Sequence, residues 1–469
     1  MKPFILGVFQ LMNPNGMSGA SWRHPDNTSL DFMDIDYWVK LAAMLEEAKF
    51  DFLFLADTYG TPIVDGEIPA VALEQAMNVP TADPVSLMSA LAVTTKKLGL
   101  VVTSATTFEP PYAHARRFST LDHFSRGRIG WNMVTGASAE SAAKAFGQPL
   151  TPHDKRYDMG DDYLDLTLKL WEGSWEDGAV IADKAAGIYA DASRVHRVVH
   201  RGEYYSTDCT YQVIPSPQRT PVLFQAGSSG RGLEFAARNA ECVFLQGTSL
   251  AKVAASVTEI HTKAQGFGRA PGSVKILVGL SVFTAPTHEE AVRKYQELLD
   301  LTTDEFAAAA YVANTGINLL ALDPSQPLPK IDAQQGQSNV DRYRSQNGEK
   351  ELTVREILDE FKSRGLRGLV LVGTPEEVAD QMEDYADQTG LDGFLFEPHI
   401  VPGTYTDIVD LLLPVLRERG RAATEYGADT LRERIFPGEG PRLAAHHPGA
   451  AFRPEPAPAQ PLYLQTVKG

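Results

Sequence analysis

The segment from Gln225 to Gly232 combines glycines, hydroxyls and one arginine in a pattern that can bind an anion. It reads Gln-Ala-Gly-Ser-Ser-Gly-Arg-Gly and lies between an apolar run and a helical pattern. Glycines at such a turn let backbone N–H groups approach a phosphate at the N-terminus of the following helix. The hydroxyls of Ser228 and Ser229 and the guanidinium of Arg231 would add donors. No Gly-Lys-Ser/Thr follows, so it is not a Walker loop, and an ordinary glycine-rich turn is the alternative.

Further polar residues stand where apolar runs end. Asp57 ends the run FLFLAD, Thr107 follows the next run, and Asn132 and Thr135 lie in the one after it. Glu397 ends the last apolar run. In a barrel of parallel strands, the active site is built from residues at these carboxyl ends. Each of them could instead cap the helix that follows.

Other classes of catalytic site find less support. Glu109 and Glu397 could form a carboxylate pair for glycoside hydrolysis, but their spacing in sequence does not show that they face each other. The 11 histidines include no His-Glu-x-x-His pair, and the adjacent His446 and His447 lie near the C-terminus, so no metal site is predicted. No Gly-x-Ser-x-Gly elbow is present, which disfavours acyl transfer.

Eight short apolar runs, each followed by a helical pattern, would position these residues. A run such as FLFLAD is apolar on both faces, as strands of a buried parallel sheet are. Eight alternating units favour a closed (β/α)8 TIM barrel of the α/β class. A doubly wound open sheet is the alternative, but its glycine fingerprint after the first strand is missing. The eight runs are Ile5–Gln10, Phe52–Asp57, Gly99–Thr106, Ile129–Thr135, Val222–Ala226, Cys242–Leu245, Lys275–Ala285 and Gly393–Glu397.

Two stretches interrupt the alternation and are predicted to be insertions. Residues 174–218 contain polar turns and short runs, and residues 304–368 mix polar residues and prolines with another helix. Segments of this length in a compact domain commonly carry function, so we expect both to cover the barrel mouth. The predicted organisation is a single barrel with insertions over 1–436 and a C-terminal extension over 437–469.

The composition of the chain limits the kinds of partner that we expect. The chain has 469 residues, of which 43 are basic and 60 acidic, for a formal charge of −17. Nucleic acids and anionic lipids attract clustered lysine and arginine, so neither nucleic acid nor a membrane is an expected partner. Cys209 and Cys242 are the only cysteines, and no signal-peptide pattern or bilayer-spanning apolar run is present. We therefore expect a cytoplasmic protein.

Several stretches together resemble the bacterial luciferase-like flavin monooxygenases. Within that family they are similar to the branch acting on nitrilotriacetate, dibenzothiophene sulfone, dimethyl sulfide and long-chain alkanes. The resemblance runs in order from about residue 5 to 436. It is carried by Trp22–Pro25, Lys49–Asp51, Phe54–Asp57, Glu109–Tyr112, Ala115–Arg117, Ser119–His123, Gly127–Thr135, His153–Asp158, Leu170–Trp175, Gln225–Gly227 and Val372–Pro375.

The resemblance implies the same barrel and a two-component enzyme. A separate NAD(P)H-dependent flavin reductase would supply reduced FMN, and O2 would add at flavin C4a. The resulting (hydro)peroxide would insert one oxygen atom into an organic substrate. We expect a homodimer or homotetramer. Two alternatives stay open: a deazaflavin (F420)-dependent oxidoreductase that transfers hydride, and a non-catalytic flavin-binding barrel.

Matching the motifs position by position implies the following flavin contacts. Asp57 and Thr107 fall near the isoalloxazine ring, and Asn132 falls beneath it. The ribityl and phosphate end is assigned to His153, Tyr157, Gly227, Ser228 and Ser229. The substrate pocket is predicted to include Asn13, Asn78 and Met133.

The sequence departs from the family pattern at Asn314. Many relatives carry histidine at the start of a His-Thr-Gly-Ile-Asn-Leu segment, which here begins with Asn314. An amide is neither acid nor base near neutral pH, so a histidine-assisted proton step at this point is not expected. Asn132 and Asn314 are the candidate catalytic positions. Few charged residues lie among the pocket positions, which favours a small, mostly apolar organic substrate.

Overall fold

Eight parallel strands close into a barrel, with β13 pairing with β1 to complete the circle. The computed structural model describes residues 2–15, 20–136, 139–227, 229–247, 249–329, 340, 351–364 and 368–454. All eight predicted runs are strands, so the predicted (β/α)8 fold is confirmed. In order around the barrel they are β1 (Ile5–Leu11), β2 (Phe52–Ala56), β3 (Gly99–Ala105), β4 (Ile129–Val134), β9 (Val222–Gln225), β10 (Cys242–Leu245), β11 (Lys275–Thr284) and β13 (Gly393–Phe396).

A further strand of this sheet, β12 (Leu369–Gly373), lies outside the eight predicted runs. It pairs with the second half of β11, with Leu280 opposite Leu369. The neighbouring β10 has 4 residues and pairs only with the first part of the 10-residue β11. The rest of β11 would otherwise present an unpaired edge, which β12 covers.

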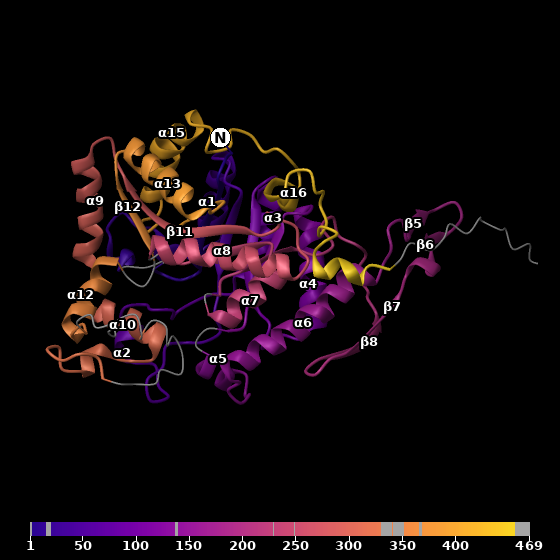
Figure 1. Cartoon of the computed structure of the whole chain (residues 1–469), viewed down its shortest axis with the longest axis horizontal. Helices are drawn as coiled ribbons and strands as arrows, with labels where there is room; N and C mark the ends of the chain where they lie inside the picture. Colours follow the sequence, from indigo (N-terminus) through magenta and orange to yellow (C-terminus); the bar gives the residue numbers. More distant parts are fainter. Residues whose placement is uncertain are drawn as a thin grey trace, which may run out of the picture.

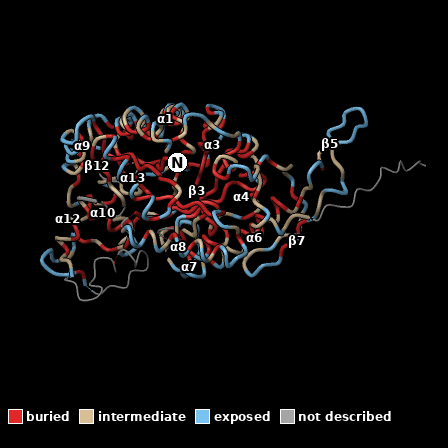
Figure 2. Tube along the Cα trace, turned by 45° about the horizontal axis from the view of Figure 1, so that its top comes forward, coloured by how far each residue is buried: buried red, intermediate tan, exposed pale blue. Residues whose placement is uncertain are grey.

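Phenylalanine side chains fill the barrel interior. Phe9 stacks on Phe54 with ring centroids 5.3 Å apart, and Phe54 also contacts the rings of Phe224 and Phe244. A second and larger apolar cluster lies between the strands and the surrounding helices. The strands are buried on both faces (Figure 2), which explains why their sequences read as unbroken apolar runs.

Helices surround the barrel, and several of them begin at a residue whose side chain caps the first turn. The Asp83 carboxylate accepts a hydrogen bond from the Val85 N–H, and Thr374 forms a capping box with Glu377. The helical stretch after β13 includes a π-helical turn at Ile408–Leu412. The main helices are α1 (Ile35–Glu47), α3 (Pro84–Thr94), α4 (Pro111–Ser125), α5 (Ala139–Ala145), α6 (His153–Gly173), α7 (Gly230–Asn239), α8 (Leu250–Gly266), α9 (His288–Leu301), α13 (Pro375–Thr389), α14 (Gly403–Asp407) and α15 (Leu413–Glu418). No helix of the described residues is long and apolar enough to cross a membrane.

The two predicted insertions occupy different places. Residues 174–218 form two antiparallel hairpins, β5 (Val180–Asp183) with β6 (Ile188–Ala190), and β7 (Arg197–Arg201) with β8 (Ser206–Thr210). The β5–β6 hairpin projects away from the barrel (Figures 1 and 2), so the expectation that residues 174–218 cover the mouth is wrong for this hairpin. The loop of the second hairpin does reach the end of β3, where the Tyr205 hydroxyl donates to the Thr106 carbonyl at 3.0 Å.

The second insertion lies on the mouth side. Its helices α10 (Asp304–Thr315) and α12 (Val354–Arg364) share a small apolar cluster, and α10 contacts α2 (Ala70–Glu74). In Figure 1 these helices and α5 lie at the lower edge, opposite the N-terminus.

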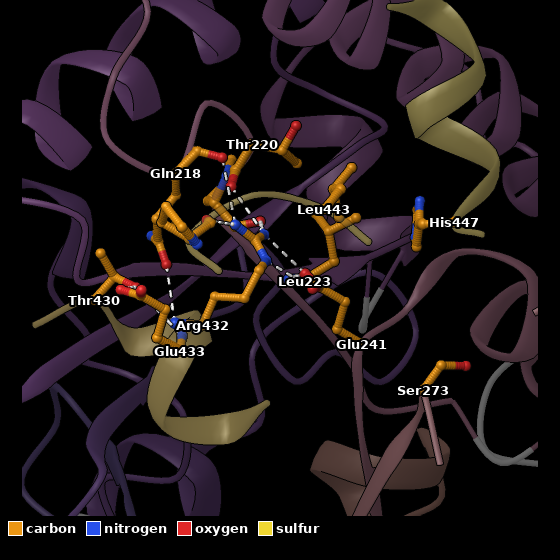
Figure 3. Close-up of polar contacts among 12 residues, drawn as sticks. Gln218, Thr220, Leu223, Glu241, Ser273, Thr430, Arg432, Glu433, Leu443 and His447 are labelled. Carbon is orange, nitrogen blue, oxygen red and sulfur yellow. Dashed lines mark hydrogen bonds and ion pairs between the residues drawn. The ribbon is translucent and has the colours of Figure 1, made fainter. Parts of the chain in front are cut away.

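The chain near its C-terminus closes the other end of the barrel. Leu431, Ile435 and Phe436, in and after α16 (Leu431–Ile435), join the interior apolar cluster. Arg432 contacts the residues just before β9 and β10, and it pairs with Glu241, with Nε 2.8 Å from Oε1 (Figure 3). Part of the chain after residue 420 is therefore buried at this end of the barrel.

Candidate active site

The predicted site residues gather into two groups at the carboxyl ends of the strands. One group lies where β9 leads into α7, beside the first turns of α6. The other lies at the ends of β2, β3 and β4, which are adjacent in the barrel. These ends face the same side because the strands are parallel, as expected for a site in this fold.

The first group forms a shallow cradle between β9 and α7. Ser229 caps α7, and its hydroxyl accepts a hydrogen bond from the Gly232 N–H at 3.0 Å. A Cβ atom on Gly227 would lie 2.9 Å from the Tyr157 hydroxyl, and one on Gly232 would lie 2.8 Å from it. Glycines at positions 227 and 232 allow this close approach between the turn, the Tyr157 hydroxyl and the first turn of α7. The donor set fits a phosphate monoester such as that of FMN.

Arg231 and His153 lie next to the cradle in different surroundings. The Arg231 guanidinium forms ion pairs with Asp158 at 3.1 Å and Asp161 at 2.5 Å. Both contacts use Nη2, so the acids of α6 offset the charge of Arg231, and its role as a further donor for the anion stays a prediction. His153 is the first residue of α6, half-exposed, with its ring 5.3 Å from that of Tyr157.

The second group contains a buried amide that lacks one partner. Asn132 lies inside the barrel on β4, and its Nδ2 donates to the Thr103 hydroxyl at 2.9 Å. Its Oδ1 has no hydrogen-bond partner among the described residues. A buried acceptor of this kind calls for a donor, and a flavin ring N–H would satisfy it. Thr107 is tied down, with its hydroxyl donating to the Thr135 carbonyl at 3.0 Å.

Asp57 lies beside a small cavity at the end of β2. Burial, together with the negative charges of Asp83 and Glu109, raises the pKa of Asp57 to about 7, although the Thr58 N–H opposes this with a 2.8 Å hydrogen bond. Asp57 is therefore the described residue of this group that can exchange a proton near neutral pH. The cavity is lined by Asp57, Thr58, Tyr59, Thr103, Ser104, Ala105, Phe108, Val134 and Gly136.

Replacing Asp57 with asparagine is expected to flatten the pH dependence of stability. The folded pKa of about 7 exceeds the unfolded value, so folding takes up a proton in between, and stability falls as pH rises through this window. Above the folded pKa the loss is complete. Melting temperatures at about pH 5 and about pH 8 should differ less for Asp57→Asn than for the wild type. Parallel curves for the two proteins would show that Asp57 is ionised throughout.

The remaining predicted residues are distributed as follows. Asn13 follows β1 and is buried, with Oδ1 lacking a partner in the described chain. Asn78 is half-buried between α2 and α3 with a left-handed φ of 52°. Met133 belongs to the cluster between strands and helices, facing away from the barrel interior, which argues against it as a pocket residue. Ser228 lies outside the described residues, as does the side chain of Asn314 in α10.

Three aromatic side chains at the mouth were not among the predicted residues. Tyr59, Phe108 and Phe146 contact one another, and each follows a different strand or helix. Glu109, considered above as a glycosidase acid, instead accepts a hydrogen bond from the Tyr59 hydroxyl and pairs with Arg117. The available sequence signal was an aromatic residue three positions after β2 and after β3, whereas Phe146 follows α5 and gave no such signal.

Known proteins resemble this chain along most of its length. The family model described as luciferase-like monooxygenase matches residues 7–393. Dimethyl-sulfide monooxygenase from Hyphomicrobium sulfonivorans is 40% identical, covering 96% of this chain and 94% of that protein. Nitrilotriacetate monooxygenase component A from Aminobacter aminovorans is 34% identical, covering 92% of this chain and 96% of that protein.

Solved structures also resemble this chain. A riboflavin lyase crystallised with modified FMN and its substrate riboflavin is 46% identical, with a TM-score of 0.91, and the match covers 97% of this chain and all of that one. Two F420-dependent enzymes, at 13% and 15% identity, share the fold alone.

Proposed function

Because the chain belongs to the luciferase-like monooxygenase family and is a flavin-dependent monooxygenase, we propose that it uses reduced FMN and O2 to insert one oxygen atom into a small, mostly apolar organic substrate. The observation that carries this proposal is the cradle of Gly227, Ser229 and Gly232 beneath the Tyr157 hydroxyl. It suits a phosphate, and the neighbouring strand ends offer the contacts that a flavin ring needs.

In this proposal, each part of the chain has a separate task. The cradle and His153 would hold the phosphate and ribityl chain, while Asn132, Thr107 and Asp57 would orient the ring. Bound reduced FMN would supply the oxygen-transfer chemistry. The protein's contribution is to position the ring and the substrate and to keep bulk water away. Asp57 can hold or release a proton there, because its pKa is raised to about 7.

The partner we propose is a separate NAD(P)H:flavin reductase acting in the cytoplasm. A relative is named as component A of nitrilotriacetate monooxygenase, and that name implies a second component. The deazaflavin alternative has less support, since the two F420-dependent enzymes match this chain at only 13% and 15% identity.

A second candidate concerns the substrate. The riboflavin lyase is 46% identical, more than the dimethyl-sulfide monooxygenase, and its structure contains riboflavin as substrate. We therefore also consider a flavin-like heteroaromatic substrate, with the same cofactor and the same cradle. The two candidates differ only in what lies at the mouth beside the ring.

One experiment tests the function and separates the candidates. The protein is titrated with FMN, and then supplied with FMN, NADH, a flavin reductase and ¹⁸O₂ together with sulfides, alkanes, aromatic compounds, amines or riboflavin. We expect FMN binding and incorporation of labelled oxygen into one substrate class. Turnover of riboflavin alone would support the second candidate. A protein that fails to bind FMN, or that oxidises reduced F420 instead, would contradict both.

We further propose a homodimer or homotetramer assembled through the β5–β6 hairpin. The hairpin projects from the barrel (Figure 2), and Ile188 and Tyr189 are 49% and 59% exposed. An isolated two-stranded hairpin is marginally stable in water, and exposed apolar residues on it suit contact with a second copy.

Changing Tyr189 to aspartate is expected to lower the mass of the assembly, because a charge would be buried at the contact. Light scattering would measure the mass, and FMN titration should show unchanged affinity. Val93→Asp, which alters another exposed apolar residue on α3, serves as the control. Identical masses for all three proteins would place the contact elsewhere.

A further inference from the structure

Three aromatic rings form a continuous surface at the barrel mouth, here called the aromatic rim and consisting of Tyr59, Phe108 and Phe146. The rings of Phe108 and Phe146 are stacked, with centroids 4.8 Å apart and planes 10° apart. Tyr59 meets Phe146 edge-on at 5.1 Å and Phe108 edge-on at 6.1 Å. The three residues follow β2, β3 and α5, so the fold brings together rings that are distant in sequence.

The aromatic rim is only partly covered. Tyr59 is 38% exposed and Phe146 42% exposed, while Phe108 is half-buried above Gly136. Leu150, close to Phe146 in sequence, is also exposed. Contiguous exposed apolar surface of this kind commonly marks a binding site.

The orientation of Tyr59 is fixed by charged neighbours. Its hydroxyl donates to Glu109 Oε1 at 2.5 Å, and Arg117 holds Glu109 Oε2 at 2.6 Å. Burial and the hydrogen bond to Glu109 raise the pKa of Tyr59, so its hydroxyl stays a donor. A hydrogen bond to an ionised acceptor is stronger than a neutral one, so the ring is held in place before any ligand arrives.

Two rings of the aromatic rim border the candidate site. Tyr59 and Phe108 line the same small cavity as Asp57 and Gly136. A ligand resting on the aromatic rim would therefore have one edge beside Asp57 and the ends of β2 to β4. A compact aliphatic ligand would gain nothing from the arrangement of these three rings. A flat aromatic ligand, in contrast, can stack on their exposed faces and contact their exposed edges.

We propose that the aromatic rim is a substrate subsite for a planar aromatic or heteroaromatic ring, with Glu109 and Arg117 as positioning residues for Tyr59. This inference rests on the proposed function, and it narrows the substrate class within it.

The test compares two ligands that share a carbon skeleton and a hydroxyl, 2-naphthol and decahydro-2-naphthol. Their affinities for the FMN-loaded protein are measured by calorimetry for the wild type and for Phe146→Leu, which keeps apolar bulk but removes the ring. We expect 2-naphthol to bind about two- to tenfold more weakly to Phe146→Leu, and decahydro-2-naphthol to bind equally to both proteins. Glu109→Gln should give a smaller loss for 2-naphthol alone.

Phe124→Leu, which removes an exposed ring on α4 away from the mouth, is the matched control and should change nothing. FMN affinity is titrated separately for the wild type and every variant. Failure of the wild type to bind FMN would speak against the proposed function and not against the aromatic rim. The subsite is overturned if both ligands weaken equally, if neither weakens, or if Phe146→Leu weakens FMN instead. In the last case the aromatic rim would belong to the cofactor site.

Discussion

Replacing Arg432 with alanine is expected to lower the free energy of unfolding by about 3–5 kcal/mol, because it leaves a buried carboxylate without its partner. The side chains of Arg432 and Glu241 are 1% and 6% exposed. Two hydrogen bonds join them, from Nε to Oε1 at 2.8 Å and from Nη2 to Oε2 at 2.9 Å (Figure 3). This bidentate geometry compensates the cost of burying both charges.

The guanidinium also satisfies backbone groups at the closed end of the barrel. Its nitrogens donate to the carbonyls of Thr220 at 2.9 Å and Pro441 at 2.7 Å. Burial alone would raise the pKa of Glu241, but the charge of Arg432 holds this pKa below its usual range. In Arg432→Ala the carboxylate would lose that charge, and several carbonyls would lose their donor.

Urea unfolding measures the effect, with Arg419→Ala as control. Arg419 forms ion pairs with Asp380 and Glu383 at the surface, so its loss should cost only about 0–1 kcal/mol. The double variant Glu241→Gln with Arg432→Met should be more stable than Arg432→Ala, since no buried charge remains. Equal losses for Arg432→Ala and Arg419→Ala would mean that the buried pair contributes no more than a surface pair.

The barrel itself could be predicted because its signal is local. Each strand is a short run buried on both faces, and such runs are visible in the sequence without knowledge of their partners. The same property explains why the orientation of Met133 could not be predicted. A strand that is apolar on both faces gives no alternation to show which residues face inward, and the structure turns Asn132 inward and Met133 outward.

Other features depend on contacts between distant segments, and these could not be predicted. The anion cradle between β9 and α7 is visible in the sequence because its glycines are close together along the chain. The ion pairs of Arg231 with Asp158 and Asp161 are not visible, because these acids belong to α6. The aromatic rim is assembled from three separate connections. Arg432 reads as one arginine in an arginine-rich tail, and only the fold brings it to Glu241.

Replacing Gly227 with alanine is expected to weaken FMN binding by about 10- to 100-fold, if the cradle holds the phosphate as proposed. The added Cβ would clash with Gln225 Nε2, and it would lie 2.9 Å from the Tyr157 hydroxyl and 3.2 Å from Gly232 Cα. Overpacking of this kind costs about 1–3 kcal/mol, and a tenfold change in affinity corresponds to about 1.4 kcal/mol. The backbone of Gly232 cannot move without displacing the first turn of α7, so the effect should fall on the anion site.

The control for this variant is Gly266→Ala, a glycine in α8 whose added Cβ would meet nothing within 4 Å. FMN affinity is measured by fluorescence titration, and melting temperatures show whether each variant is folded. Gly266→Ala should bind FMN as the wild type does, because its alanine affects only a remote helix. A folded Gly227→Ala protein with wild-type affinity would mean that the phosphate lies away from the turn between β9 and α7. The flavin would then have to enter the mouth in a different orientation, with Asn132 no longer beneath its ring.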